Sequence, residues 1–329
     1  MNYYSEIKKE LINNEITKKV KDYSKNRSDL NTYYNVGRLI TEAQGGLTRA
    51  KYGENLIKEY SARLTIDLND KKYSYRNLMN MRKFYILFRN EKVNALRSQL
   101  SWSHYRELLK LKDFDEIRYY INAAIESKIS YRELKEKIKS KEYERLSKST
   151  KEKLISDESC KLTELIKNSV VIKTNKNYEN ISEKLLQKII LEDIESFMNE
   201  LGNSFSFIGS EYKIKLGDRY NYIDLLLFNY EYNCFVVVEL KVTELKKEHI
   251  GQIQIYMNYI DMHLKKFNQD KTIGIILCKK ENKYIIEYCS DSRIIERKYI
   301  IVNHVSFSNL FQQDSSIYPL HKYFYNLSL

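Results

Sequence analysis

Two carboxylates and a lysine lie within apolar stretches of this sequence, where unpaired charges are costly. Asp224 interrupts one apolar run, and Glu239 and Lys241 follow another. The polar residues 229–233 separate the runs, which predicts two buried antiparallel strands joined by a turn. Reflection through a turn centred near Glu231 places Asp224 opposite Glu239, with Cβ atoms about 4.5–5.5 Å apart. Two carboxylates at that distance favour a bound cation and indicate metal-dependent nuclease chemistry.

The pattern Glu-x-Lys alone is not specific, because it occurs eight times in the chain. Only Glu239 follows four consecutive apolar residues and has an aspartate at the mirrored position. Strand alternation points Glu239 and Lys241 to the same side of the sheet. A buried structural ion pair is an alternative of equal weight. Gln252 and Tyr256 share a face of the next predicted helix, which adds support for catalysis.

The elements that must position these residues follow from periodicity. A long helix is predicted from Ile181 to a stop near Gly202. Strands and one further helix then alternate in the order αβββαβ, with a last strand, and form a mixed sheet. The strands are predicted at 205–216, 220–228, 234–242, 272–278 and 284–288, and the second helix at 247–264.

Chain length predicts about two domains, at roughly 150 residues each. Residues 1–150 read as a basic helical domain that suits a winged-helix or helix-turn-helix fold. Residues 151–178 are polar and lysine-rich and are interpreted as a linker, and residues 179–329 as the α/β domain. Within the first domain, Ser74 is a predicted helix cap, and Ser130 with Glu133 has the form of a capping box.

Basic charge is concentrated in the first domain. Residues 1–150 hold 32 basic and 20 acidic side chains, whereas the remainder holds 24 of each, so the first part carries the whole net charge of +12. A polyanion is the natural partner of such a surface, although a lone lysine-rich stretch is more often a solvated face. The candidate nucleic-acid-binding residues are Lys71, Lys72, Arg76, Arg82, Lys83 and Arg89.

Other features narrow the class of protein. The chain has no apolar run long enough for a membrane span and no signal-peptide pattern, which favours a cytoplasmic location without membrane contact. Its four cysteines lack the spacing of zinc sites or of a disulfide framework and are interpreted as reduced structural residues.

These residues resemble the PD-(D/E)XK nuclease superfamily, and more closely its YhcG-type branch, which has a winged-helix-like N-terminal region. The resemblance covers most of the chain. Tyr34 and Ile129 depart from it, because the branch usually has tryptophan at both places. The matching segments are 197–209, 222–228, 236–241, Gly251-Gln252 with Tyr256, and 272–278 in the C-terminal half, and 77–85, 100–105 and 132–134 in the N-terminal half.

The resemblance implies roles for individual residues. Asp224 and Glu239, with the Leu240 carbonyl, would bind Mg²⁺, and Mn²⁺ would substitute for it. Glu192, on the preceding helix, would supply a further carboxylate, with a solvent-facing glutamate as an equal alternative. Lys241 would orient or activate water, and Gln252 and Tyr256 would line the site and place the phosphate.

The expected function is a Mg²⁺-dependent endonuclease that acts on DNA in genome defence, restriction, or recombination and repair. A DNA-binding or adaptor protein with a silent nuclease fold is one alternative, and an RNA-directed nuclease is another. A homodimer and partner proteins of a defence or restriction system are further hypotheses. The intact set of Asp224, Glu239 and Lys241 favours an active enzyme over a silent one.

Overall fold

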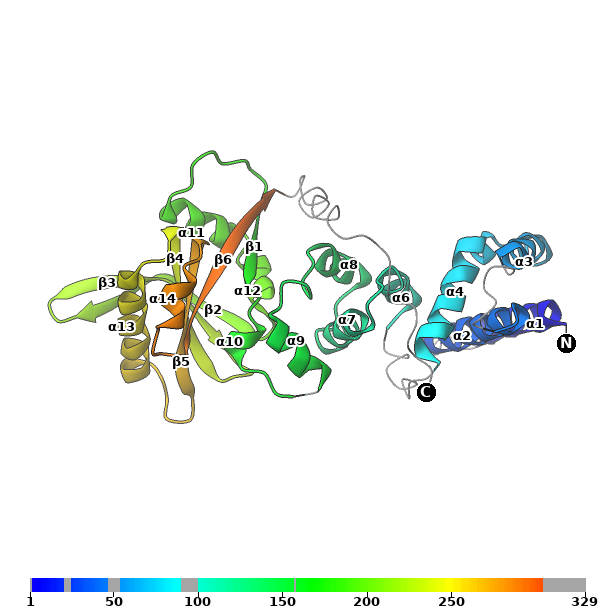
Figure 1. The fold of residues 1–329 in the computed structure, drawn as a ribbon, viewed down its shortest axis with the longest axis horizontal. Helices are drawn as coiled ribbons and strands as arrows, with labels where there is room; N and C mark the ends of the chain where they lie inside the picture. Colours follow the sequence, from blue (N-terminus) through cyan, green and yellow to red (C-terminus); the bar gives the residue numbers. More distant parts are fainter. Residues whose placement is uncertain (1, 21–24, 47–53, 90–99, 157, 304–329) are drawn as a thin grey trace. The chain divides into compact units, whose positions relative to one another are not determined.

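The computed structural model describes residues 2–20, 25–46, 54–89, 100–156 and 158–303 (Figure 1). The chain divides into two compact units, residues 1–138 and 139–329, and each is described by itself. Among the described residues, no helix is both long and apolar enough to cross a membrane.

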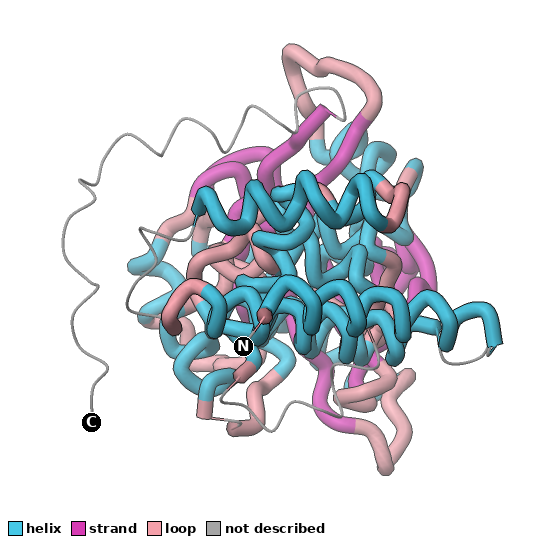
Figure 2. Tube along the Cα trace, turned by 90° about the vertical axis from the view of Figure 1, so that its right-hand side faces the viewer, coloured by secondary structure: helices cyan, strands magenta, loops and turns pink. Residues whose placement is uncertain are grey.

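The first unit is helical where it is described, as Figure 2 shows by colour. Its core combines the apolar faces of successive helices around residues such as Ile7, Val36 and Met81. No strand occurs among its described residues, so the wing of the expected winged helix is not seen there. The elements are α1 (Tyr3–Val20), α2 (Lys25–Ala43), α3 (Glu54–Asp67), the 3-10 helix η3 (Lys71–Tyr73), α4 (Tyr75–Phe88), α6 (Trp102–Leu108), α7 (Phe114–Glu126) and α8 (Tyr131–Lys139).

Helix ends in this unit follow the predicted caps. Ser74 occupies the N-cap position of α4 in an extended conformation, as predicted, but its side chain makes no capping hydrogen bond. The backbone N–H of Ser130 donates to Glu133 Oε2, at 2.6 Å, and the N–H of Glu133 donates to Ser130 Oγ, so the predicted capping box is confirmed. The helix that this capping box opens, α8, ends at Lys139.

The second unit is built on one mixed six-stranded sheet in the order β1-β6-β5-β4-β3-β2. The pairs among β1, β6, β5 and β4 are parallel, and β4, β3 and β2 form an antiparallel meander. The elements are α9 (Lys148–Ile155), α10 (Leu162–Leu165), β1 (Ser169–Thr174), α11 (Glu183–Glu192), α12 (Ile194–Leu201), β2 (Phe205–Leu216), β3 (Arg219–Asn229), β4 (Cys234–Glu244), α13 (Lys247–His263), β5 (Asp270–Lys280), α14 (Lys283–Glu287) and β6 (Ile294–Asn303).

Helices cover both faces of the sheet, which explains the unbroken apolar run of β4. Val236 and Val238 pack with α11 and α12, whereas Val237, between them, packs with α13. Helix α13 lies close to β5 because Gly274 has no side chain: a Cβ there would lie 2.6 Å from Met257 Sδ. The sheet is therefore the middle of three layers.

Three sequence expectations differ from this structure. The segment 151–178, expected as a linker, contributes α10 and the edge strand β1 to the second unit. The single helix expected from Ile181 is two helices, because Asp193 has a non-helical backbone and caps α12. The strand predicted at 284–288 is wrong: α14 occupies that region, and the last strand is β6.

Candidate active site

The β3–β4 meander places Asp224 and Glu239 beside each other. The observed register pairs Leu225 with Val238, as the sequence predicts, and Asp224 and Glu239 are the next residues along the two strands. The turn is held by Asn229, whose Oδ1 accepts from two backbone N–H groups of the turn. The mirrored positions are therefore set by local turn geometry.

Asp224 lies at the point where β3 leaves β4. Its Oδ2 accepts a 2.7 Å hydrogen bond from the backbone N–H of Leu240, so a side chain replaces the next ladder contact. Its backbone carbonyl accepts from Gln187 Nε2 of α11 at 2.9 Å. These contacts fix the Asp224 backbone and one carboxylate oxygen from two different elements.

Glu239 is the most deeply buried carboxylate of this group, with 2% of the residue exposed. Its Oε1 accepts from Lys241 Nζ at 2.8 Å, whereas its Oε2 is buried without a hydrogen-bond partner. Burial, and then the nearby charge of Asp224, raise the pKa of Glu239 to about 7. An unpartnered buried carboxylate oxygen is costly, so this atom needs a proton or a cation.

Lys241 is enclosed by carboxylates. Its Nζ lies 2.8 Å from Glu239 Oε1 and 3.8 Å from Glu183 Oε2. Burial by itself lowers the pKa of the ammonium group, but the charges of Glu239, Glu183 and Asp224 outweigh it, and the net pKa is raised. Lys241 therefore stays protonated and acts as a fixed positive charge.

The glutamate that α11 brings to this group is Glu183, and not the expected Glu192. Glu183 opens the first turn of α11, one turn before Gln187, so both reach the same region. Glu192 is exposed at the other end of the helix, about 13 Å away at 1.5 Å per residue. The sequence signal for Glu183 is its place directly after the capping Ser182, whose Oγ accepts from the N–H of Leu185.

Helix α13 supplies the remaining side chains. Gln252 Nε2 donates to the hydroxyl of Tyr256 at 3.0 Å, as their spacing on one helix face predicts. Burial raises the pKa of Tyr256, which also senses the charges of Glu239, Lys241 and Asp224. His249 on the same helix has its pKa lowered by burial and by the charge of Lys241.

The donor set suits a hard cation in part. Within the described residues, no three histidine, cysteine or acidic side chains form a ready metal cluster. Asp224 and Glu239 nevertheless offer carboxylate oxygens, and Glu239 Oε2 has no other partner. Burial also raises the pKa of Asp224, against the opposing effects of the Leu240 N–H and Lys241. Two carboxylates with raised pKa values are the arrangement that a divalent cation relieves.

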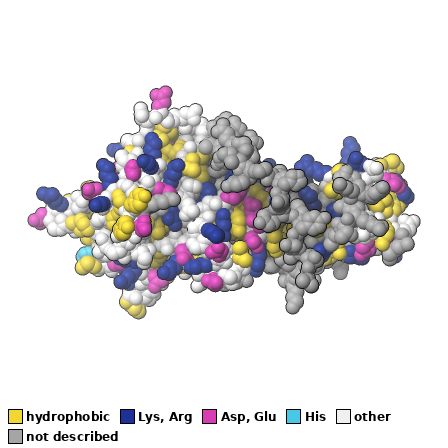
Figure 3. Space-filling model, viewed as in Figure 1, with side chains coloured by type: hydrophobic (Ala, Val, Ile, Leu, Met, Phe, Trp, Pro, Cys, Tyr) yellow, Lys and Arg dark blue, Asp and Glu magenta, His cyan; other side chains and the backbone are white. Residues whose placement is uncertain are grey.

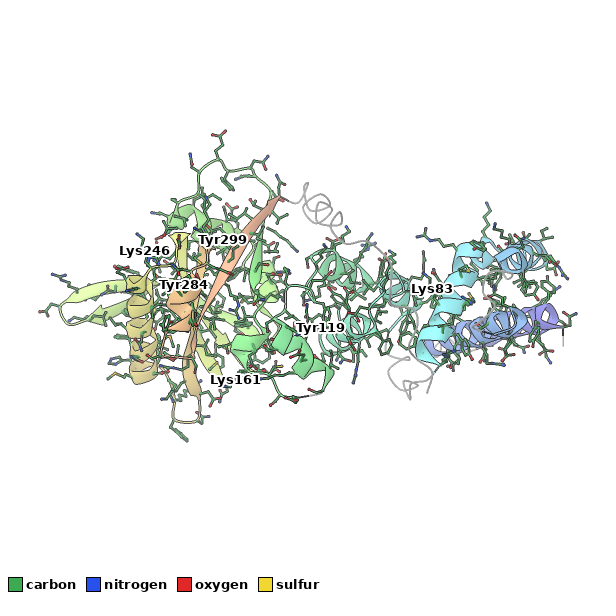
Figure 4. All side chains as sticks on the ribbon, viewed as in Figure 1. Lys83, Tyr119, Lys161, Lys246, Tyr284 and Tyr299 are labelled. Carbon is green, nitrogen blue, oxygen red and sulfur yellow. The ribbon has the colours of Figure 1, made fainter. Side chains whose placement is uncertain are left out.

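The candidate nucleic-acid residues all lie in the first unit, but their environments differ. Arg76 and Lys83, seven residues apart, are exposed on one side of α4, and Arg89, at the C-cap of this helix, is also exposed (Lys83 is labelled in Figure 4). Arg82 is half-buried, and its Nε has no hydrogen-bond partner. Lys72 is already paired with Glu15 and Asp70, at 2.5 and 3.0 Å.

The remaining candidate, Lys71, is exposed on η3, outside α4. On the face that Figure 3 shows, basic and acidic side chains are interspersed over the second unit. The exposed residues of α4 are therefore a more concentrated source of positive charge than that face.

Two family models match the chain in succession. The DUF1016 N-terminal domain matches residues 7–145, and the YhcG PDDEXK nuclease domain matches residues 163–309. The chain belongs to the YhcG family of PDDEXK nuclease proteins. Among curated proteins, this YhcG-family chain is similar to "Putative nuclease YhcG" of Escherichia coli strain K12, with 27% identity over 287 residues and 76% of each chain covered.

Similar solved structures include a repair endonuclease from Pyrococcus abyssi and an EndoMS–dsDNA complex, at 16% and 17% identity. Each alignment covers 39% of this YhcG-family chain and about half of the other chain (49% and 48%), with a TM-score of 0.26.

Proposed function

We propose that this YhcG-family chain is a divalent-metal-dependent endonuclease that hydrolyses phosphodiester bonds in DNA, with Mg²⁺ as the ion and Mn²⁺ as a substitute. One observation carries the proposal. Glu239 Oε2 is buried and has no hydrogen-bond partner, although Asp224 and the fixed charge of Lys241 lie beside it. A purely structural ion pair satisfies its buried oxygens, whereas this pair leaves one for a ligand.

In this proposal the residues of the candidate site have different roles. Asp224 and Glu239, with the Leu240 carbonyl, would hold the cation, which when bound supplies positive charge against the charge that develops on the phosphate. Lys241 adds a second positive charge, and Glu183 and Glu239 hold its ammonium group in place. Tyr256 and Gln252, bonded to each other, present polar groups from α13 that would orient the phosphate.

The exposed basic residues of α4 would supply affinity for the phosphate backbone. The family match gives the nuclease class, and this positive charge supports a polyanionic substrate, of which DNA is the one that we propose. Phosphate contacts carry little information on the sugar, so matched DNA and RNA substrates belong in the same assay.

The test is cleavage of plasmid, linear, branched and single-stranded DNA and of matched RNA, with Mg²⁺, Mn²⁺ or EDTA. The variants are Glu239→Gln, Lys241→Ala and, as control, Glu244→Gln, which alters another Glu-x-Lys sequence at a half-exposed position. We expect metal-dependent cutting that both site variants lose and the control keeps.

Three results would overturn the proposal in whole or in part. Cutting that persists in Glu239→Gln at full rate would place the chemistry elsewhere. Tight DNA binding without cutting by any metal-loaded protein would support a binding or adaptor role, and preference for RNA would redirect the substrate.

A further inference from the structure

The hairpin formed by the outer parts of β2 and β3 extends beyond the rest of the sheet. Residues 219–223 pair with β2 only, because the contact of β3 with β4 begins at Leu225. The hairpin turns at Gly217, whose φ of 61° suits a glycine. Its tip projects past α13 at the left of Figure 1.

One side of this hairpin is a face of two lysines and two tyrosines. Lys213 pairs with Tyr222, and Lys215 pairs with Tyr220, and facing residues of a ladder point to the same side. The next residue along, Ile214, points to the other side and is buried in the core with α13. We call these four residues, Lys213, Lys215, Tyr220 and Tyr222, the hairpin face.

The side chains of the hairpin face are exposed, and a contact between two of them fixes their relative positions. Tyr220 and Tyr222 are 55% and 52% exposed, and both lysines are exposed. Lys213 Nζ lies 3.8 Å from the centre of the Tyr220 ring, a cation–π contact that holds the ring and the charge together. Of the two carboxylates of the hairpin, Asp218 lies in its turn, and Glu211 lies at its base, where its negative charge acts on Asp224.

The hairpin face leads directly to the candidate site. Tyr222 precedes Asp224 by two residues and Tyr220 by four, or about 7 and 13 Å at 3.3 Å per strand residue. Asp224 marks the point where the hairpin leaves the sheet.

Ile214 and Ile223, behind the hairpin face, lie on the α13 side with Val237. This is also the side of Glu239, so the hairpin face itself points to the other side. A nucleic-acid strand that reaches Asp224 would meet these rings by following β3 past the point where the hairpin leaves the sheet.

Alternating aromatic rings and ammonium groups match the two features of an unpaired strand, its base faces and its phosphates. A ring on a sheet surface stacks on a base only when that base has left the duplex. In a continuous duplex, neighbouring bases already cover each other. We propose that the hairpin face binds unpaired nucleotides beside the scissile phosphate, and that the substrate class is DNA with a single-stranded segment at the cutting position.

The expected changes in DNA affinity can be estimated from known contributions of stacked bases and phosphate contacts. Each base stacked on an aromatic side chain contributes about 5- to 150-fold in affinity. The two lysines add phosphate contacts, so their replacement lowers the salt dependence of binding to single strands. This inference rests on the proposed nuclease function, because it places the strand by the position of Asp224.

The test measures binding and cutting separately in the full chain. Binding of labelled single-stranded, forked and duplex DNA is followed by fluorescence anisotropy in EDTA, and cutting of the forked DNA with Mg²⁺. The variants are Tyr220→Ala with Tyr222→Ala, the same pair changed to Phe, and Lys213→Gln with Lys215→Gln. The control is Tyr230→Ala, a tyrosine that is 64% exposed and directly follows the far end of β3.

We expect the double alanine variant to lose at least 5-fold in affinity for single-stranded and forked DNA, with little change for duplex DNA. The Phe variant keeps the affinity because it keeps the rings, and Tyr230→Ala binds like the wild type. A double alanine variant that binds and cuts forked DNA like the wild type would contradict the proposed role of the hairpin face. The proposed nuclease function would not be affected by that result. If binding depends on the two tyrosines but no metal-dependent cutting occurs, the proposed role of the hairpin face is supported and the proposed nuclease activity is contradicted.

Discussion

The carboxylate of Glu183 lies 3.8 Å from the ammonium group of Lys241, and this contact joins the first turn of α11 to the end of β4. Glu239, two residues earlier on β4, accepts a hydrogen bond from the same ammonium group. Lys241 is thus fixed from a helix and from its own strand, which a single ion pair would not achieve. The surrounding carboxylates therefore determine both the position of the Lys241 ammonium group and its raised pKa.

Glu183→Gln should lower the cleavage rate about 10-fold or more, with a smaller effect on substrate affinity, because Lys241 loses one of the groups that position it. Glu192→Gln is the matched control on the same helix, and we expect it to cut like the wild type, since Glu192 lies at the other end of α11 from the Lys241 contact. Single-turnover rates with Mg²⁺ measure the difference. Equal rates for the two variants would show that Glu183 has no role in the site.

Removal of metal should make stability depend on the protonation of Glu239. Its pKa rises from 4.5 to about 7 in the folded protein, so the folded state favours the protonated form. The metal-free protein therefore loses stability as pH rises from about 4.5 to 7, by up to roughly 3 kcal/mol at about 1.4 kcal/mol per pKa unit.

Urea unfolding in EDTA at pH 5 and pH 8 tests whether the metal-free protein loses stability as the pH rises. Glu239→Gln should be more stable than the wild type at pH 8 and differ little at pH 5. Addition of Mg²⁺ should restore much of the wild-type stability at pH 8, because binding to the folded state is stabilising. A wild type that gains stability relative to the variant at pH 8 without metal would contradict the raised pKa.

DNA affinity should depend on the exposed basic residues of α4 more than on Lys72. Arg76→Gln combined with Lys83→Gln should weaken binding and reduce the slope of log affinity against log salt by about two, at about 0.9 per phosphate contact. Lys72→Gln is the matched charge control, because its ammonium group already pairs with Glu15 and Asp70. Anisotropy titrations at several salt concentrations would refute this expectation if both variants gave the wild-type slope.

The ion pair of Arg145 with Glu200 should stabilise the second unit. Both side chains are nearly buried, Arg145 also donates to the carbonyl of Ser169, and Glu200 accepts from the N–H of Val171. Glu200→Ala leaves an unpaired buried charge, and we expect it to cost about 3–5 kcal/mol of unfolding free energy.

The exposed pair of Lys148 with Glu152 offers the control, since Glu152→Ala should change stability by less than about 1 kcal/mol. Chemical denaturation of the full chain, with a probe in the second unit, compares the two. Similar small losses for both variants would show that the Arg145 contact adds nothing beyond a surface pair.

The sequence predicts the β3–β4 register well because a short polar turn fixes which residues face each other. Asp224 and Glu239 follow from that local rule. The choice between Glu183 and Glu192 depends on how α11 crosses the sheet, and periodicity within the helix does not contain that information. The wrong strand at 284–288 has a similar cause, since a short run of aromatic and β-branched residues suits a strand as well as the helix α14.

The pairing of β1 with β6 has a consequence for synthesis on the ribosome. Ser169 lies opposite Lys298 in the register, so β1 has no sheet partner until nearly all of the second unit has been translated. At roughly 5–20 residues per second, that interval lasts on the order of 6–26 s. During it the Asp224–Glu239 meander can already form from local contacts, while the backbone N–H and C=O groups of β1 that pair with β6 have no partner strand. Chains that stop before Ile294 should therefore be prone to aggregation and to capture by chaperones.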